Sequence, residues 1–257
     1  MEMNSVIQKI ADTLRALSPS ENRRHFASAV ILAAGSGERF GSDLGPKQFC
    51  PVCSVPALVH TLRAFEASSY IHEIIIVTRE ADILRCREYA DQYGITKVTN
   101  VIAGGSDRQE SAKRGFDAIA GKSEYVAIHD GARCLITTEI IDNTIRAAYE
   151  YGAAIAAERS RDTVKIATDS GFAKDSPDRN TVWLAKTPQV FLADMYRAAI
   201  YTAEKDNVRA TDDSMLVERL GFKVKMVECG NENIKLTTRN DLAIAESILR
   251  RRQEEIK

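Results

Sequence analysis

Short β-branched runs alternate with amphipathic stretches over most of the chain, and this alternation is what most constrains the fold. The runs SAVILAA (28–34), IHEIIIVT (71–78) and EYVAIHD (124–130) are almost continuously apolar. Helical patterns such as PALVHTLRAFEAS (56–68) and RQESAKRGFDAIAG (108–121) lie between them. Apolar strands joined by crossover helices are typical of a parallel sheet that is buried on both faces. The sequence therefore predicts an α/β protein with a mostly parallel sheet.

Composition excludes several classes of protein. The 257 residues, 44% of them hydrophobic, suffice for one large α/β domain or two small ones. A net charge of −1 argues against a general nucleic-acid binder, because such proteins carry a basic face. No apolar stretch approaches the roughly 20 residues of a membrane helix, and the acidic residues near the start do not suit a signal peptide. We therefore expect a cytoplasmic protein that binds neither nucleic acid nor membrane.

The cysteines form no even framework, so reduced thiols are expected. The chain has five of them: Cys50, Cys53, Cys86, Cys134 and Cys229. The spacing of Cys50 and Cys53 occurs in redox motifs and in half of a zinc site, yet no second CxxC or HxxxH pair accompanies it. The preferred interpretation is that both pack as small apolar residues.

Three loops that follow predicted strands are rich in glycine, arginine and acidic residues. They span 33–41, 103–111 and 129–133. Ligands of open α/β sheets bind outside the carboxyl ends of the strands, so these loops are expected to converge on one site. The polar stretch 159–186 instead interrupts the alternation with two β-like pieces (163–168 and 181–186), which is typical of a functional segment or an interface arm.

The loop after the first strand is suited to an anion. Its glycines at 35, 37, 41 and 45 fit neither the dinucleotide fingerprint nor a P-loop. Glycines do let backbone N–H groups approach phosphate oxygens, and Arg39 and Lys47 add full charges. A plain strand-to-helix turn with solvated basic residues is the alternative.

The second and third loops each allow two interpretations. Residues 104–111 offer hydrogen-bond donors at the start of a helix, where Ser106 or Asp107 could equally be a simple N-cap. Asp130 follows a buried strand directly, a position where a carboxylate can hold Mg²⁺ against phosphate oxygens. His129 precedes it on an apolar strand, and we expect a hydrogen-bonded core residue rather than a base.

Seven motifs in this order resemble the 2-C-methyl-D-erythritol 4-phosphate cytidylyltransferase family, from about Ala29 to Leu249. They are AAGSGERFGSDLGPKQF, GGSDRQES, HDGAR, RDTVK, DRNTVWLAKTPQVF, TDDSMLVERLG and ENIKLTTRNDLAIAE. The resemblance implies a Rossmann-like nucleotidyltransferase fold: a mostly parallel mixed sheet with helices on both faces and an extended β-arm for dimerisation. It also implies transfer of the cytidylyl group from CTP to 2-C-methyl-D-erythritol 4-phosphate, with release of pyrophosphate, in non-mevalonate isoprenoid biosynthesis.

The resemblance assigns roles to individual residues. Arg39, Lys47 and Lys235 match the catalytic cations, and Asp130 matches the acid linked to Mg²⁺, the expected cofactor. The expected CTP-binding residues are Ala33, Ala34, Gly35, Gly37, Gly105, Ser106, Arg108, Ser111, Asp130 and Gly131. The residues expected to bind the sugar-alcohol phosphate are Arg133, Thr163, Arg179 and Thr187.

The expected organisation is a helical extension at 1–28, with an amphipathic helix at 5–17, before a single nucleotidyltransferase domain at 29–252. In the family, the counterpart of Arg179 reaches into a second subunit on an extended arm, so residues 159–186 are the expected dimerisation arm of a homodimer. Cys134 stands where the family usually has proline, and Glu232 replaces a frequent aspartate, which leaves any part of Glu232 in the metal site open.

Parts of the sequence are also compatible with three other functions. A ribitol 5-phosphate cytidylyltransferase shares several of the motifs, but the AAG start, Trp183 and the segment 211–221 favour the methylerythritol enzyme. A non-catalytic CTP-binding regulatory protein has little need for Arg39, Lys47 and Lys235 together. A Rossmann oxidoreductase would place an acidic residue about 20 positions after its glycines at a strand end, and the acid that follows the strand at 71–78, Glu80, comes much too late.

Overall fold

The computed structural model describes residues 25–35 and 45–255 of the chain. The expected helix at 5–17 and the loop residues Gly37 and Arg39 lie outside these ranges, so their predictions are not addressed by the structure.

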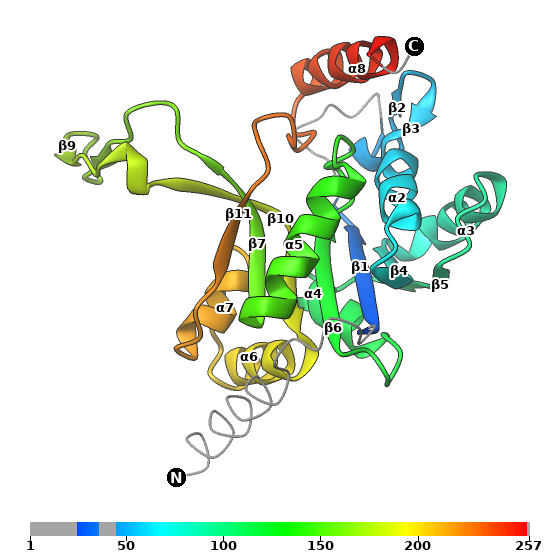
Figure 1. Cartoon of the computed structure of the whole chain (residues 1–257), viewed down its shortest axis with the longest axis horizontal. Coiled ribbons are helices and arrows are strands. Elements are labelled where there is room, and N and C mark those ends of the chain that lie inside the picture. Colours follow the sequence, from blue (N-terminus) through cyan, green and yellow to red (C-terminus); the bar gives the residue numbers. More distant parts are fainter. Residues whose placement is uncertain (1–24, 36–44, 256–257) are drawn as a thin grey trace.

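A seven-stranded sheet in the order β11-β7-β10-β6-β1-β4-β5 forms the centre of the described fold (Figure 1). Its strands are β1 (Ala27–Ala33), β4 (Ile71–Thr78), β5 (Val98–Ala103), β6 (Tyr125–Asp130), β7 (Ala153–Arg159), β10 (Trp183–Leu192) and β11 (Lys225–Glu228). Neighbouring strands are parallel except at β10, which runs antiparallel to β6 and β7. The predicted mostly parallel mixed sheet is confirmed.

Helices cover both faces of this sheet, as two successive residues of β1 show. A Cβ placed on Gly115 of α4 would lie 2.3 Å from Val30, so α4 sits close against the face to which Val30 points. Ile31 points to the other face, where Leu58 of α2 lies beside it. The helices are α2 (Ala57–Ala67), α3 (Ile83–Gln92), α4 (Arg108–Asp117), α5 (Thr138–Tyr151), α6 (Ala193–Lys205), α7 (Asp213–Arg219) and α8 (Arg239–Glu254).

Contacts between helices assign several of them to a face. The hydroxyl of Ser68, just after α2, donates to Asp142 of α5 at 2.5 Å, so α5 shares the face of α2. Phe116 of α4 meets Tyr196 of α6 edge to face with ring centroids 5.1 Å apart, so α6 shares the face of α4. The core between these layers is built from the apolar runs read in the sequence, because every residue of β6 and all but one of β1 and β4 are buried.

An arm projects from the body between the end of β7 and the start of β10 (Figure 1). It carries the small hairpin of β8 (Ile166–Ala167) and β9 (Ala173–Asp175). Of the two strands expected within 159–186, the first at 163–168 and the second at 181–186, only the second joins the main sheet. The second is the start of β10 and pairs with β7, whereas only Ile166 and Ala167 of the first form a strand, and they pair with β9.

A bulge interrupts the ladder between β10 and β7. Ala185 lies opposite Ala157 and Gln189 lies opposite Ile155. Three residues of β10, 186–188, therefore stand against the single Ala156 of β7, which is two more than a regular ladder would have. The bulge turns Thr187 toward the end of β6, where its hydroxyl accepts the Asp130 N–H at 3.1 Å.

A second, smaller core lies under the C-terminal helix. Cys50, Val52, Leu135, Leu236 and Ala245 are among its buried members. Cys50 packs here, as the packing interpretation predicts, while the Cys53 backbone N–H donates to Glu246 of α8 at 3.3 Å. All five cysteines are free thiols. Within the described ranges, no helix has both the length and the apolar character needed to cross a bilayer.

Candidate active site

A pocket of about 390 Å³ lies at the carboxyl ends of the parallel strands. The three loops expected to converge there do so, within the part of the chain that the structure describes. The lining residues are Leu32, Ala33, Ala34, Gly35, Lys47, Gln48, Gly105, Ser106, Asp107, Arg108, Ser111, Asp130, Ala132 and Lys235. The ends of β1, β5 and β6 thus form one cavity, to which the loop after β11 adds Lys235.

Gln48 holds the first loop in place. It is buried in the short helix at Lys47–Phe49, and its Nε2 donates to the carbonyls of Ala33 at 2.7 Å and Gly35 at 3.3 Å. These bonds tie the end of β1 to the turn that carries Lys47 into the pocket wall. The sequence contained this residue in its PKQ motif, but gave no indication of the role.

The second loop is shaped by close contacts that require glycine. A Cβ on Gly104 would lie 2.7 Å from the Cβ of Ala34, so this glycine lets the first and second loops touch. A Cβ on Gly105 would lie 2.4 Å from Glu110. The carboxylate of Glu110 accepts the backbone N–H of Ser106 at 2.8 Å, an interaction that lowers the pKa of Glu110 to about 2 together with the Ser106 hydroxyl and Arg114. The loop is therefore fixed before any ligand enters.

The start of α4 confirms the N-cap interpretation for Asp107 and gives Ser111 a second task. The Asp107 side chain accepts the N–H of Glu110 at 2.8 Å. The Ser111 hydroxyl donates to the Asp107 carbonyl at 2.8 Å and accepts the Gly105 N–H at 3.0 Å. Ser111 lines the pocket, but its hydroxyl already holds the loop together.

Asp130 lies at the centre of a cluster of cations. Its Oδ2 is 2.8 Å from Lys235 Nζ and 3.5 Å from Arg133 Nε, and its Oδ1 is 3.4 Å from Arg108 Nε. Burial by itself raises the pKa of this carboxyl, but Lys235, Arg108 and Arg133 outweigh it and hold the pKa well below its usual range. Asp130 is therefore a permanent carboxylate on the pocket wall.

The loop that carries Lys235 is anchored from several sides. Asn233 is fully buried, its Nδ2 donates to the Thr187 carbonyl at 2.9 Å, and its own carbonyl accepts from Arg133 at 2.9 Å. The Leu236 N–H donates to the Ala132 carbonyl at 2.9 Å. Lys235 thus stands between two residues that are bonded to the β6 and β10 loops, which fixes it beside Asp130.

Glu232 ties the same loop to α8. Its two carboxylate oxygens are each paired with an arginine, Oε1 with Arg251 and Oε2 with Arg252. Arg252 also donates to the Leu135 carbonyl at 2.9 Å. Both oxygens of Glu232 are therefore committed to the helix, which favours an anchoring role over a metal ligand at this position.

His129 and Thr187 form a buried pair behind Asp130. The Thr187 hydroxyl lies 3.0 Å from His129 Nδ1, and both side chains are buried. Burial lowers the pKa of His129 to about 3, so the imidazole is neutral at physiological pH. The expectation of a hydrogen-bonded core histidine is confirmed.

Comparison with known proteins shows the family to which the chain belongs. The family model described as 2-C-methyl-D-erythritol 4-phosphate cytidylyltransferase (IspD) matches residues 27–251. The chain belongs to this family. It is accordingly an enzyme of the cytidylyltransferase class, and its fold is that of the family's solved structures.

Individual relatives match over almost their whole length. A 2-C-methyl-D-erythritol 4-phosphate cytidylyltransferase from Caldanaerobacter subterraneus subsp. tengcongensis is 41% identical over 225 residues, which cover 87% of this chain and 99% of the relative. One from Clostridium botulinum (strain Loch Maree) is 40% identical over 222 residues, covering 86% and 96%.

Solved structures give the same result. A 4-diphosphocytidyl-2C-methyl-D-erythritol synthase from Anaerococcus prevotii superimposes with a TM-score of 0.80 at 33% identity, covering 88% of this chain and 97% of that one. The 2-C-methyl-D-erythritol 4-phosphate cytidylyltransferase from Thermus thermophilus gives a TM-score of 0.71 at 27% identity, with coverage of 88% and 99%.

Most of the site residues predicted from the family resemblance line the pocket, but several lie elsewhere. Ala33, Ala34, Gly35, Lys47, Gly105, Ser106, Arg108, Ser111, Asp130 and Lys235 line it. Gly131 is buried behind it, where its N–H donates to the Leu32 carbonyl at 2.8 Å. Arg133 and Thr187 contact Asp130 from outside the lining. Thr163 and Arg179 are exposed on the arm.

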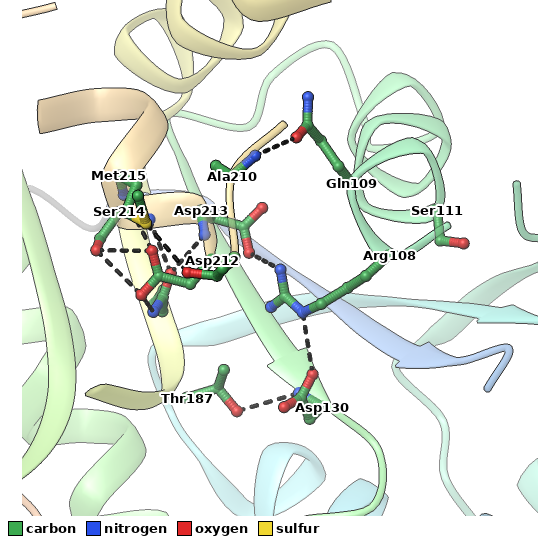
Figure 2. Close-up of polar contacts among 12 residues, drawn as sticks. Arg108, Gln109, Ser111, Asp130, Thr187, Ala210, Asp212, Asp213, Ser214 and Met215 are labelled. Carbon is green, nitrogen blue, oxygen red and sulfur yellow. Dashed lines mark hydrogen bonds and ion pairs between the residues drawn. The ribbon is translucent and has the colours of Figure 1, made fainter. Parts of the chain in front are cut away.

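The family motif at 211–221 contains a residue whose role the sequence did not reveal. Asp213 is the first residue of α7, and its Oδ2 lies 2.7 Å from Arg108 Nη1 (Figure 2). The only available signal was a pair of adjacent acids before an amphipathic helix, which normally indicates an N-cap. Asp212 is that cap, accepting the Met215 N–H at 3.0 Å, and Asp213 is buried.

Proposed function

We propose that the protein transfers the cytidylyl group of CTP to 2-C-methyl-D-erythritol 4-phosphate and releases pyrophosphate. The observation that carries this proposal is the pocket itself. In a member of this family, Lys47, Arg108 and Lys235 line one cavity together with the permanent carboxylate of Asp130. Such a cavity complements a nucleoside triphosphate, which carries roughly three to four negative charges.

The chemistry requires positioning and charge stabilisation rather than a nucleophilic side chain. A phosphate oxygen of the acceptor attacks the α-phosphorus of CTP in line, a new P–O bond forms, and the bond to the β-phosphate breaks as pyrophosphate leaves. The attacking phosphate is already ionised, so no strong base is needed. Lys47 and Lys235 supply positive charge to the transition state. Arg39, which lies outside the described residues, is proposed as a further cation of this set.

Magnesium is the proposed cofactor, and the donor set fits it. Mg²⁺ usually takes one or two carboxylates and completes its shell with water and substrate phosphates. Within the described ranges there is no group of three or more acidic, cysteine or histidine side chains that could form an all-protein cage. Asp130 lines the pocket, unlike Glu232, and would be the single carboxylate if Mg²⁺ took the place of Lys235 at its Oδ2. Mg²⁺ bound there would neutralise phosphate charge.

A homodimer is proposed as the working form. Arg179 lies on the projecting arm and is exposed, so it does not line the pocket of its own chain. Apolar side chains on the same arm are exposed as well, with Phe172 at 74% and Ile166 at 47%. Burial of these groups against a second copy would bring Arg179 and Thr163 to the neighbouring pocket, where they are proposed to bind the acceptor phosphate.

The proposed organisation is a single catalytic domain at 29–252, preceded by an extension at 1–28. The match to the family model begins at residue 27, which supports this boundary. The five free thiols support a reducing compartment, and we place the enzyme in the cytoplasm.

The test is pyrophosphate release from purified protein with Mg²⁺, using CTP, UTP and ATP in turn against methylerythritol phosphate and ribitol phosphate. We expect release with CTP and methylerythritol phosphate, and its loss in Lys47→Ala. Preference for ribitol phosphate would retain the chemistry and reject the acceptor. CTP binding without release for any pair would reject the enzyme and favour a regulatory CTP-binding protein.

A further inference from the structure

The guanidinium of Arg108 contacts two carboxylates from different parts of the chain, those of Asp213 and Asp130. Its Nη1 lies 2.7 Å from Asp213 Oδ2, and its Nε lies 3.4 Å from Asp130 Oδ1 (Figure 2). The third guanidinium nitrogen, Nη2, is buried and has no hydrogen-bond partner among the described residues. A buried charged donor that lacks a partner is costly. Because Arg108 lines the pocket, a ligand bound there would supply an acceptor for the guanidinium.

Asp213 is itself held rigidly. Its side chain is only 1% exposed, and its Oδ1 accepts the hydroxyl of the buried Tyr196 at 2.6 Å. Its backbone N–H donates to Gln189 Oε1 at 3.0 Å, and Gln189 Nε2 donates to Asp212 at 2.9 Å. The start of α7 is thereby fixed to β10 and α6, which holds the Asp213 carboxylate beside Arg108.

The segment before α7 is fixed to α4 as well, next to Arg108. Gln109 Nε2 donates to the Val208 carbonyl at 3.1 Å, and its Oε1 accepts the Ala210 N–H at 3.1 Å (Figure 2 shows the second bond). These two bonds hold the segment 208–210, which leads to Asp213, against α4, the helix that carries Arg108. The geometry of the ion pair therefore does not depend on the side chains alone.

The electrostatics keep the guanidinium charged although it is largely buried. Burial lowers the pKa of Arg108, but Asp213 and then Asp130 outweigh this effect and raise the pKa above its ordinary value. Asp213 makes the shorter of the two contacts. Without it, Asp130 would be the remaining carboxylate within reach, and Arg108 would pair with Asp130 more closely.

We propose that Asp213 is a positioning residue of the CTP pocket: it holds the side chain of Arg108, a residue of the pocket lining, where its guanidinium can pair with a phosphate oxygen of CTP, and keeps Arg108 from closing onto Asp130. The inference rests on the proposed function. It assigns a purpose to the acidic start of the motif at 211–221, because Asp213 itself does not line the pocket.

The test measures CTP binding by calorimetry on the full chain with Mg²⁺ and no acceptor, beside thermal unfolding of the same samples. Asp213→Asn keeps the shape of the side chain and removes its charge, and we expect the Kd for CTP to rise about tenfold. The matched control is Asp206→Asn, which breaks the ion pair with Arg219 of α7 without contact to Arg108. We expect its Kd to stay within about twofold of wild type.

A double-mutant cycle separates positioning from a merely structural role. Arg108→Met removes the guanidinium and leaves the Asp213 carboxylate buried. Adding Asp213→Asn to Arg108→Met should leave the CTP affinity unchanged, because there is no guanidinium left to position, and should raise the melting temperature, because the unpaired buried charge is gone. A structural role for Asp213 would instead weaken CTP binding further in the Arg108→Met protein.

Two results would overturn the inference: wild-type CTP affinity in Asp213→Asn, or an equal loss caused by Asp213→Asn with and without Arg108. If Asp213→Asn does not fold, Tyr196→Phe replaces it and should raise the Kd about threefold, only when Arg108 is present; an unchanged Kd would reject the inference. The proposed function fails separately, if the wild type releases no pyrophosphate. Absence of CTP binding by the wild type would reject both.

Discussion

Lys235 Nζ lies 2.8 Å from Asp130 Oδ2, although Asp130 ends β6 and Lys235 belongs to the loop after β11. The contact places a cation and a permanent carboxylate on the same wall of the pocket. It also shows that the Asp130 carboxylate is already paired with a cation before a ligand enters. A phosphate or a metal ion that binds here must therefore replace one partner of this ion pair.

Replacement of Lys235 should affect turnover more than CTP binding. Lys235→Met keeps most of the stem and removes the charge, and we expect kcat to fall about 10²- to 10³-fold, by analogy with loss of an oxyanion donor. Steady-state pyrophosphate release measures the effect. Lys225→Met on the exposed strand β11 is the control and should retain wild-type kcat. A kcat for Lys235→Met within threefold of wild type would remove Lys235 from the mechanism.

Gln48 is expected to matter for both stability and CTP affinity. Gln48→Leu has a similar size but removes the shorter side-chain donor of the buried Ala33 carbonyl, which keeps only the 3.4 Å bond from the Thr78 hydroxyl, and this should lower the free energy of unfolding by about 1–3 kcal/mol. The Kd for CTP should rise as the first loop loses its shape. Denaturant unfolding and calorimetry measure the two effects, and an unchanged Kd would show that the loop keeps its conformation without Gln48.

Glu232 should behave as an anchor and not as a metal ligand. Glu232→Gln weakens the contacts with Arg251 and Arg252, and we expect kcat to fall about tenfold while the Mg²⁺ concentration for half-maximal activity stays the same. Arg252→Met should give the same result from the other side of the contact. Arg250→Met, on the exposed surface of α8, is the control. A selective increase in the Mg²⁺ requirement of Glu232→Gln would instead identify a ligand.

Burial of His129 should make stability depend on pH. Its pKa is about 3 in the folded protein and near 6.5 when exposed, so the unfolded chain binds this proton more tightly. The neutral imidazole therefore makes its full contribution to the free energy of unfolding above pH 6.5. This contribution is lost as the pH falls toward 3, at about 1.4 kcal/mol per pH unit. Asp130 favours the protonated form, whereas Arg133 and Lys235 oppose it.

Comparison with His129→Gln isolates this effect from other titrating groups. Between pH 7 and pH 5, wild type should lose about 2 kcal/mol more unfolding free energy than the variant, measured by urea denaturation without CTP. Equal losses in the two proteins would mean that His129 is protonated in the folded state.

The arm should be required for assembly. We expect the wild type to sediment as a dimer and Phe172→Asp to shift it toward monomer, because a charge replaces an apolar group that is 74% exposed in the single chain. Activity should fall with dimer content. Leu84→Asp on α3 is the matched control, since Leu84 is 67% exposed but lies away from the arm. A wild-type monomer that is fully active would refute the proposed dimer.

The strands and the meeting of the three loops could be predicted because they depend on local patterns. Continuous apolar runs specify buried strands, and parallel connection places their carboxyl ends at one edge. Asp130 and Lys47 were found for the same reason, since Asp130 ends β6 and Lys47 belongs to the glycine-rich connection that follows β1, both at that edge. The short β8 shows the limit: TVKIAT has strand propensity, but only Ile166 and Ala167 have partners on β9.

The positioning residues could not be predicted, because their partners are distant in sequence. Asp213 meets Arg108 only when α7 packs beside α4, and Gln48 meets the Ala33 carbonyl only when the turn folds back on β1. An acid before a helix and a glutamine after a lysine have many simpler explanations. Tertiary packing selected one of them in each case.

The bulge of β10 has a consequence for insertions and deletions. The bulge adds two residues to β10, and side chains of a strand alternate with a period of two residues. The side chains of Trp183–Ala185, at the base of the arm, and of Gln189–Leu192, in the core, therefore keep the same alternation between the two faces of the sheet. Loss of a single residue from 186–188 would reverse one of these sets, whereas loss of two would keep the parity but remove contacts that Lys186 makes with Glu158 or that Thr187 makes with Asp130 and Asn233. Length variation at this point of the chain is therefore restricted to even numbers.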